Sequence, residues 1–183
     1  MLSHNVAELL KSPPGTTREV AIEEASPQLG PELVPATPLR GSARLCRSGG
    51  GLIVDCVVHT SITLDCARCL KSFARVATAR FEEEFSPTVS VLTGAPLTPA
   101  EDDALRIDDR HVLDLTEAVR QYLLMSLPLK PVCTPSCRGL CPTCGADLNE
   151  SACACAEKPT SGPLAGLASL LPPEQRLRRS STG

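Results

Sequence analysis

The chain has 183 residues, 42% of them hydrophobic and 21% charged, and a formal net charge of −3. This is the composition of a globular protein rather than a disordered or collagen-like one. Aromatic residues make up only 2%, which argues against the stacking platform that most single-strand nucleic-acid binders use. No apolar run approaches the roughly 20 residues of a membrane span, and no signal-peptide pattern follows Met1. We therefore expect a cytoplasmic protein.

Charge is distributed unevenly along the chain. Residues 40–80 carry seven basic and two acidic side chains, whereas residues 81–117 carry two basic and ten acidic ones. Such blocks indicate a polarised surface rather than a uniformly basic nucleic-acid binder. In the alternative interpretation, the two blocks are solvated faces of one sheet that pair with each other.

The N-terminal part of the chain predicts a short helix and a first strand. The helix covers residues 6–11, with Asn5 as its N-cap and Pro13 ending it. Residues 18–24 alternate between apolar and polar side chains and predict a strand. The proline-rich segment 26–37 predicts an irregular crossing or edge segment.

The strongest strand signal runs over residues 52–66. Its apolar side chains share one parity: Leu52, Val54, Cys56, Val58, Ile62 and Leu64. A glycine turn at 49–51 pairs this strand with a shorter one at 43–47, and a third extended stretch follows at 73–85. The sequence therefore predicts a β-meander with a CxxC motif at one of its turns.

The remainder of the chain predicts loops and further short helices. Residues 87–109 are rich in proline, glycine and acidic side chains and predict a mobile acidic loop. Asp114 is placed to cap a helix over residues 114–126, with Glu117 at the capping-box position. A last short helix is predicted at 164–171.

These elements define an α+β fold, mainly an antiparallel β-meander with a few short helices and a zinc-bound, cysteine-rich C-terminal region. We expect a β-rich domain over residues 1–130, a zinc-binding region over 131–171 docked on the 66–69 turn, and a disordered basic tail over 172–183.

Ten cysteines in a protein of a reducing compartment indicate metal ligation rather than disulfides. Eight lie at close spacing: Cys66, Cys69, Cys133, Cys137, Cys141, Cys144, Cys153 and Cys155. The CPxCG run at 141–145 is typical of a zinc knuckle, in which Gly145 adopts a positive φ. Eight thiolates supply two closed tetrahedral sites, and closed zinc sites are structural.

Spacing alone does not divide the eight ligands between sites. The preferred division places Cys141, Cys144, Cys153 and Cys155 in one site, and Cys66, Cys69, Cys133 and Cys137 in the other. The alternative is a single metal that pairs the two CxxC motifs and leaves the other cysteines reduced. An iron–sulfur cluster would also accept four thiolates.

Evidence for catalysis is missing from the sequence. Neither CxxC motif lies between a strand and the N-terminus of a helix, as thiol redox motifs do. Cys46 and Cys56 fit small buried hydrophobic residues, and His59 and His111 fit surface or satisfied groups. The sequence contains no phosphate-binding glycine loop, serine elbow or HExxH motif, so we expect no enzyme.

Several runs together resemble a known family. They are NVAELLKSP at 5–13, CARCL at 66–70, DL at 114–115, LPL at 127–129, Cys133 together with CRGLCPTCGADLN at 137–149, and CAC at 153–155. They are similar to the YceD-like family of bacteria and plastids, the large ribosomal RNA subunit accumulation proteins. The run at 137–149 is the most specific part of the resemblance.

The resemblance implies a non-enzymatic factor for the accumulation of large-subunit ribosomal RNA and for large ribosomal subunit biogenesis. Its expected partners are large-subunit rRNA or a pre-ribosomal particle, together with a zinc-ribbon ribosomal protein of the large subunit. Arg68, Lys71 and Arg75 are then the candidates for contacting RNA phosphate. In the alternative, the protein is a zinc-stabilised adaptor for a basic ribosomal protein and does not contact RNA.

Overall fold

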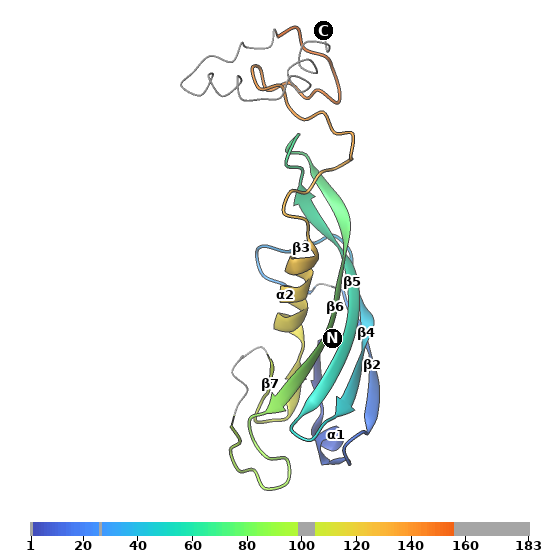
Figure 1. Cartoon of the computed structure of the whole chain (residues 1–183), viewed down its shortest axis with the longest axis vertical. Helices are drawn as coiled ribbons and strands as arrows, with labels where there is room; N and C mark the ends of the chain where they lie inside the picture. Colours follow the sequence, from blue (N-terminus) through green and yellow to red (C-terminus); the bar gives the residue numbers. More distant parts are fainter. Residues whose placement is uncertain (1, 26, 99–104, 156–183) are drawn as a thin grey trace, which may run out of the picture. The chain divides into compact units, whose positions relative to one another are not determined.

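The computed structural model describes residues 2–25, 27–98 and 105–155 (Figure 1). The chain divides into two compact units, Met1–Ser136 and Cys137–Gly183. The first unit holds the helices and strands of the described residues. Among the residues described, no helix is both long and apolar enough to cross a membrane.

A sheet forms the body of the first unit (Figure 1). Its strands are β1 (Ser3–Asn5), β2 (Thr17–Glu24), β3 (Val34–Pro35), β4 (Leu39–Arg47), β5 (Leu52–Asp65), β6 (Ser72–Pro87), β7 (Arg106–Ile107) and β8 (Val112–Asp114). They follow the order β1-β8-β7-β6-β5-β4-β2, and β3 pairs with β5. Consecutive strands β4, β5 and β6 pair antiparallel, which confirms the predicted meander.

The alternation of buried and exposed side chains along β5 shows which face of the sheet contacts the core. Its even-numbered apolar side chains from Leu52 to Ile62 are buried, and Leu64 is half-buried. Ile53 and Val57, the apolar exceptions on the other face, are each 37% exposed. The predicted core face of this strand is therefore confirmed.

Two helices complete the described part of the first unit: α1 (Ala7–Lys11) and α2 (Thr116–Ser126). In Figure 1, α2 lies against one face of the sheet, and it packs on β6. Ala118, Val119 and Leu123 are the buried residues of α2. Tyr122 stacks on Phe81 with ring centroids 4.8 Å apart and donates a hydrogen bond to the Glu83 carboxylate.

The helix starts differ in detail from the sequence prediction. Asn5 accepts from the Ala7 N–H (3.1 Å), although it belongs to the short strand β1. Asp114 accepts from the Thr116 N–H (2.9 Å), as a capping residue would. The predicted capping box is wrong, because the Glu117 carboxylate instead accepts two hydrogen bonds from Arg120, at 2.8 and 2.6 Å.

For residues 87–109 the sequence predicts a mobile acidic loop, and the described residues of this segment include short β-pairings. Val89 and Pro96 form an isolated β-bridge, and Arg106–Ile107 pairs parallel with β6 as strand β7. The acidic residues 101–103 lie outside the described residues, as do the predicted helix at 164–171 and the tail at 172–183.

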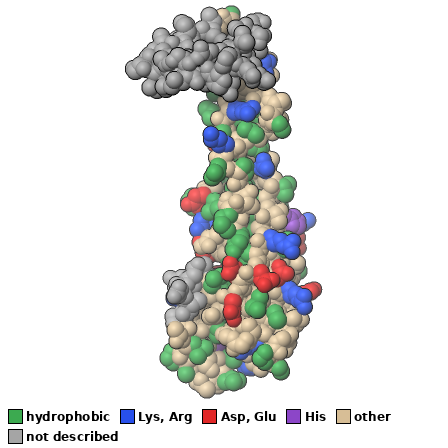
Figure 2. All heavy atoms as spheres, viewed as in Figure 1, with side chains coloured by type: hydrophobic (Ala, Val, Ile, Leu, Met, Phe, Trp, Pro, Cys, Tyr) green, Lys and Arg blue, Asp and Glu red, His purple; other side chains and the backbone are tan. Residues whose placement is uncertain are grey.

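The outer face of the sheet, opposite the core, carries mixed charge. Arg40 lies across from Glu23 on β2, with a 3.2 Å ion pair. Arg44 lies in register between Glu19 and Asp55, and Asp55 is paired with Glu82. Figure 2 shows acidic and basic side chains side by side over the sheet. Part of the basic block is thus balanced by acidic residues on neighbouring strands.

Candidate metal centres

The first CxxC motif forms the turn between β5 and β6. The Cys66 N–H donates to the Lys71 carbonyl and the Leu70 N–H to the Cys66 carbonyl, both at 2.9 Å. The Arg68 N–H points at the Cys66 sulfur, 3.5 Å away. The turn requires a positive φ at the residue after the second cysteine, where Leu70 has a φ of 60°.

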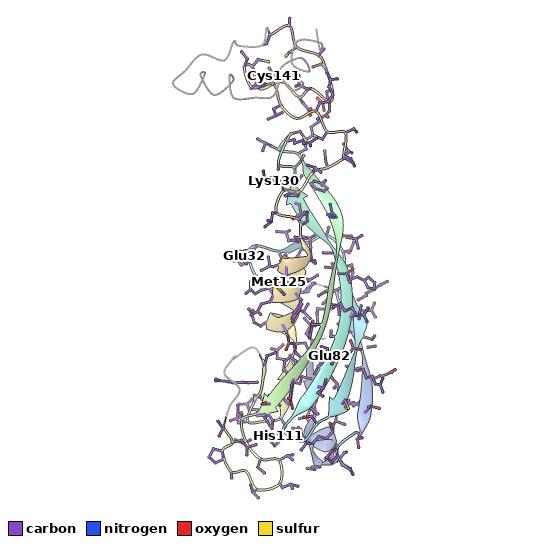
Figure 3. All side chains as sticks on the ribbon, in the orientation of Figure 1. Glu32, Glu82, His111, Met125, Lys130 and Cys141 are labelled. Carbon is purple, nitrogen blue, oxygen red and sulfur yellow. The ribbon has the colours of Figure 1, made fainter. Side chains whose placement is uncertain are left out.

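The second CxxC motif, in the second unit, folds into the same turn. The Cys141 N–H donates to the Ala146 carbonyl (2.8 Å) and the Gly145 N–H to the Cys141 carbonyl (2.9 Å). The Thr143 N–H points at the Cys141 sulfur, 3.4 Å away. Gly145 has a φ of 73°, as predicted from the sequence. Two different sequences thus form matching knuckles. Figure 3 labels Cys141 in the second of them.

The turn geometry favours the thiolate of the first cysteine in each motif. Hydrogen bonding from the Cys69 backbone, followed by that from the Cys133 backbone, lowers the pKa of Cys66 to about 6. Hydrogen bonding from the Cys144 and Thr143 backbone lowers the pKa of Cys141 to about 6. Backbone N–H groups stabilise the charged sulfur because they are donors to it. Since the thiolate is the form of cysteine that binds metal, the geometry of both turns favours binding of a cation.

The eight sulfurs gather in two groups of four. One comprises Cys66, Cys69, Cys133 and Cys137, and the other comprises Cys141, Cys144, Cys153 and Cys155; within each group the ligand atoms lie within 4.8 Å of one another. These are the two sets of the preferred division. The Cys69 and Cys133 sulfurs are 3.7 Å apart.

The donor chemistry of both groups fits zinc. Four sulfurs at such separations suit a tetrahedral Zn²⁺ with bonds near about 2.3 Å. The neighbouring Cys144 side chain raises the pKa of Cys155 to about 12, because a second negative charge close to the first sulfurs is unfavourable. A dication bound by the four cysteines would supply the positive charge that removes this repulsion and would take the place of that proton.

The remaining cysteines and histidines lie away from these groups. Cys56 is fully buried, and its burial raises its pKa to about 12, as expected of an inert core thiol. Cys46 is half-buried on β4. His59 is exposed on β5, whereas His111 is half-buried with a φ of 59°.

The proposed RNA-contacting residues lie at the CxxC end of the β5–β6 hairpin. Arg68 is part of the knuckle, Lys71 follows it, and Arg75 projects from β6; all three are exposed. The Ala67 N–H donates to the Pro131 carbonyl (2.7 Å), so the neighbouring Lys130 comes to this end as well (Figure 3). The sequence spacing of the basic residues does not predict that Lys130 lies here, because it belongs to the segment that follows α2.

Comparison with known proteins identifies the family. The family model described as large ribosomal RNA subunit accumulation protein YceD matches residues 54–171. The chain belongs to this family. The match includes both knuckles and all eight grouped cysteines, and no solved structure matches the chain.

Curated relatives come from plants and bacteria. The chain is 34% identical over 161 residues to the chloroplastic large ribosomal RNA subunit accumulation protein YCED homolog 1 of Zea mays, covering 73% of this chain and 54% of the relative. It is 26% identical over 167 residues to the Arabidopsis thaliana homolog 1, covering 78% and 52%. An uncharacterized protein of Mycobacterium tuberculosis is 33% identical over 98 residues, covering 54% and 45%. The chain spans about half the length of these relatives.

Proposed function

We propose that this protein is a non-enzymatic factor for the accumulation of large-subunit ribosomal RNA and for large ribosomal subunit biogenesis, stabilised by two structural zinc ions. The observation that carries the proposal is the match of the YceD family model over a region with two four-cysteine groups. The names of the family and of its plant members refer to ribosomal RNA accumulation and to no catalytic activity.

Each zinc ion has a structural role. Four thiolates complete a tetrahedral shell and leave no position for a water molecule or a substrate, so the ion cannot act as a hydrolytic catalyst. In the second unit, the residues from Cys137 to Cys155 form no helix or strand. Binding of a metal ion supplies the folding free energy that such a loop-rich segment does not obtain from a hydrophobic core.

Elemental analysis of the purified full chain tests the metal centres. We expect about two zinc ions per chain, since the two groups are separate. Cys141→Ser should reduce the zinc content by one ion, whereas the buried Cys56→Ala should leave it unchanged. One zinc ion in the parent would favour the single-metal alternative. Iron together with a visible chromophore would indicate an iron–sulfur cluster instead of zinc.

Contact with RNA is assigned to the basic end of the hairpin. Arg68, Lys71 and Arg75 lie within one turn and the first residues of β6, and all three are exposed. Each side chain that neutralises a phosphate contributes about 0.7–0.9 to the slope of log K against log salt. Their joint replacement by glutamine should therefore flatten this slope by about 2 to 3 units for a large-subunit rRNA fragment.

The matched control replaces three arginines of the outer sheet face, Arg40, Arg44 and Arg80, by glutamine. This control removes the same amount of positive charge as the replacement of Arg68, Lys71 and Arg75. It should change the salt slope less, because acidic residues lie opposite Arg40 and Arg44 across the sheet. Zinc content and the circular dichroism spectrum should match the parent in both variants. Equal salt slopes for the parent and for the variant with Arg68, Lys71 and Arg75 replaced (the hairpin variant) would refute the RNA contact.

A second candidate function is supported by the charges of the outer face. Asp55 and Glu82 are paired in register, and Glu84 lies one row further along β6. This arrangement suits an adaptor that holds a basic ribosomal protein and does not contact RNA. If it is correct, replacing Glu82 and Glu84 by glutamine should weaken capture of a purified basic zinc-ribbon ribosomal protein, and the hairpin variant should not.

A further inference from the structure

Asn149 contacts a cysteine of the first group from the loop that holds the second group. In sequence it lies between Cys144 and Cys153, two cysteines of the second group. Its side-chain Nδ2 is 3.5 Å from the sulfur of Cys137, which belongs to the first group. Asn149 and Cys137 both belong to the second unit.

Two contacts fix the orientation of the Asn149 amide. Its Oδ1 accepts a hydrogen bond from the Arg138 N–H at 2.7 Å, and a backbone N–H can only donate. Its Nδ2 donates to the Asp147 carboxylate at 2.7 Å, and an ionised carboxylate can only accept. The NH₂ group must therefore be the atom that faces the Cys137 sulfur.

The loop that carries Asn149 is tied to the second knuckle. Leu148 N–H donates to the Gly139 carbonyl (2.9 Å), and Leu140 forms an isolated bridge with Asp147. The Asn149 N–H itself donates to the Asp147 carboxylate at 2.8 Å. Closing the second cysteine group therefore positions the amide that reaches the first.

We propose that Asn149 is a positioning residue that couples the two metal centres by donating an N–H···S hydrogen bond to the Cys137 thiolate. The inference rests on the proposed zinc centres. The bond stabilises the negative charge of the Cys137 thiolate and holds this ligand in place, and such outer contacts are typically worth 10- to 100-fold in metal affinity. The first ion is thus bound more tightly when the second is present.

Asn149→Asp is the most direct test, because it keeps the oxygen that accepts from Arg138 and replaces the NH₂ donor by a carboxylate oxygen that cannot donate. In chelator competition on the fully zinc-loaded chain, we expect one of the two ions to be lost at 10- to 100-fold lower chelator concentration. Asn5→Asp is the matched control, since Asn5 also accepts from a backbone N–H and donates to a carbonyl. It should release both ions as the parent does.

A spectroscopic readout separates a sulfur contact from a general loosening of the loop. In the protein loaded with ¹¹³Cd, each centre should give one resonance, assigned by its coupling to cysteine β-protons. Asn149→Asp should shift the first-group resonance and leave the second in place. A double variant, Asp147→Asn with Asn149→Asp, removes carboxylate repulsion inside the loop; if it restores the parent affinity and spectrum, the inference is wrong.

Coupling between the centres is measured by a double-mutant cycle. Cys144→Ser, which disables the second group, should weaken zinc binding at the first group in the parent background and much less in the Asn149→Asp background. Strictly additive effects would overturn the coupling. A parent that binds fewer than two metal ions would refute the proposed zinc centres instead, so the two failures are distinguishable.

Discussion

Leu70 has a backbone conformation that normally favours glycine, and its replacement has a predictable sign. The residue has a φ of 60° after the second cysteine of its knuckle, where the other knuckle has Gly145 at 73°. An L-residue in the left-handed region costs about 1–2 kcal/mol, because Cβ crowds the following carbonyl oxygen. The Leu70 side chain is 68% exposed, so little packing is lost when it is removed.

The comparison of Leu70→Gly with Leu70→Ala gives the magnitude. At an ordinary exposed position, glycine is less stable than alanine by about 0.5–1 kcal/mol, because it loses more conformational freedom on folding. Alanine at position 70 keeps the left-handed cost and glycine does not. The order should therefore reverse, with Leu70→Gly more stable than Leu70→Ala by about 1 kcal/mol.

Urea unfolding in saturating zinc, followed by far-ultraviolet circular dichroism, measures this difference. Val76 is the matched control: it is 69% exposed within β6, and there Val76→Gly should be less stable than Val76→Ala. Gly145→Ala should weaken zinc retention by the second group, because alanine introduces the same strain. If alanine matches or exceeds glycine in stability at position 70, the argument from the left-handed conformation is refuted.

Two further predictions concern the first unit. Hydrogen bonds from Arg120 and then Gln121 lower the pKa of Glu117 from 4.5 to about 2. The stability that they contribute is complete above pH 4.5 and is lost as the pH falls toward 2. The free energy of unfolding should therefore fall less steeply with acid in Glu117→Gln than in the parent, by less than about 1 kcal/mol because the pair is partly exposed. A Cβ at Gly51 would lie 2.0 Å from the Phe85 carbonyl oxygen, whereas one at Gly49 meets nothing within 4 Å. Gly51→Ala should therefore cost about 2 kcal/mol or more in urea unfolding, and a similar cost for Gly49→Ala would show that steric overlap is not the cause.

The long central strands could be predicted from the sequence because one face of each is buried. Over fourteen residues of β5, a slip of one position would move the whole apolar set to the solvent side. Strands β1, β7 and β8 have only two or three residues, too few to show a period. Their pairing depends on partners distant in sequence, such as Ser3 opposite Asp114.

The cysteine groups were predictable for a related reason. Spacing within a CxxC motif is local and fixes a turn, whereas the contact of Asn149 with Cys137 crosses twelve residues of irregular chain. The equivalence of Leu70 and Gly145 was hidden, because leucine rarely adopts a positive φ. The same turn forms with leucine at this position, so glycine is not required for it.

The first metal centre and the proposed RNA contact are adjacent in the chain, and this gives a last prediction. The Arg68 N–H faces the Cys66 sulfur at 3.5 Å, so an ion bound by Cys66 would also fix the backbone from which the Arg68 side chain extends. Removing zinc should weaken rRNA binding in the parent and add little in the variant that lacks Arg68, Lys71 and Arg75, because both changes act on one contact. Salt titrations of the four combinations measure this. Equal weakening by zinc removal in the parent and in the variant would separate the metal from the contact and assign the ion to stability alone.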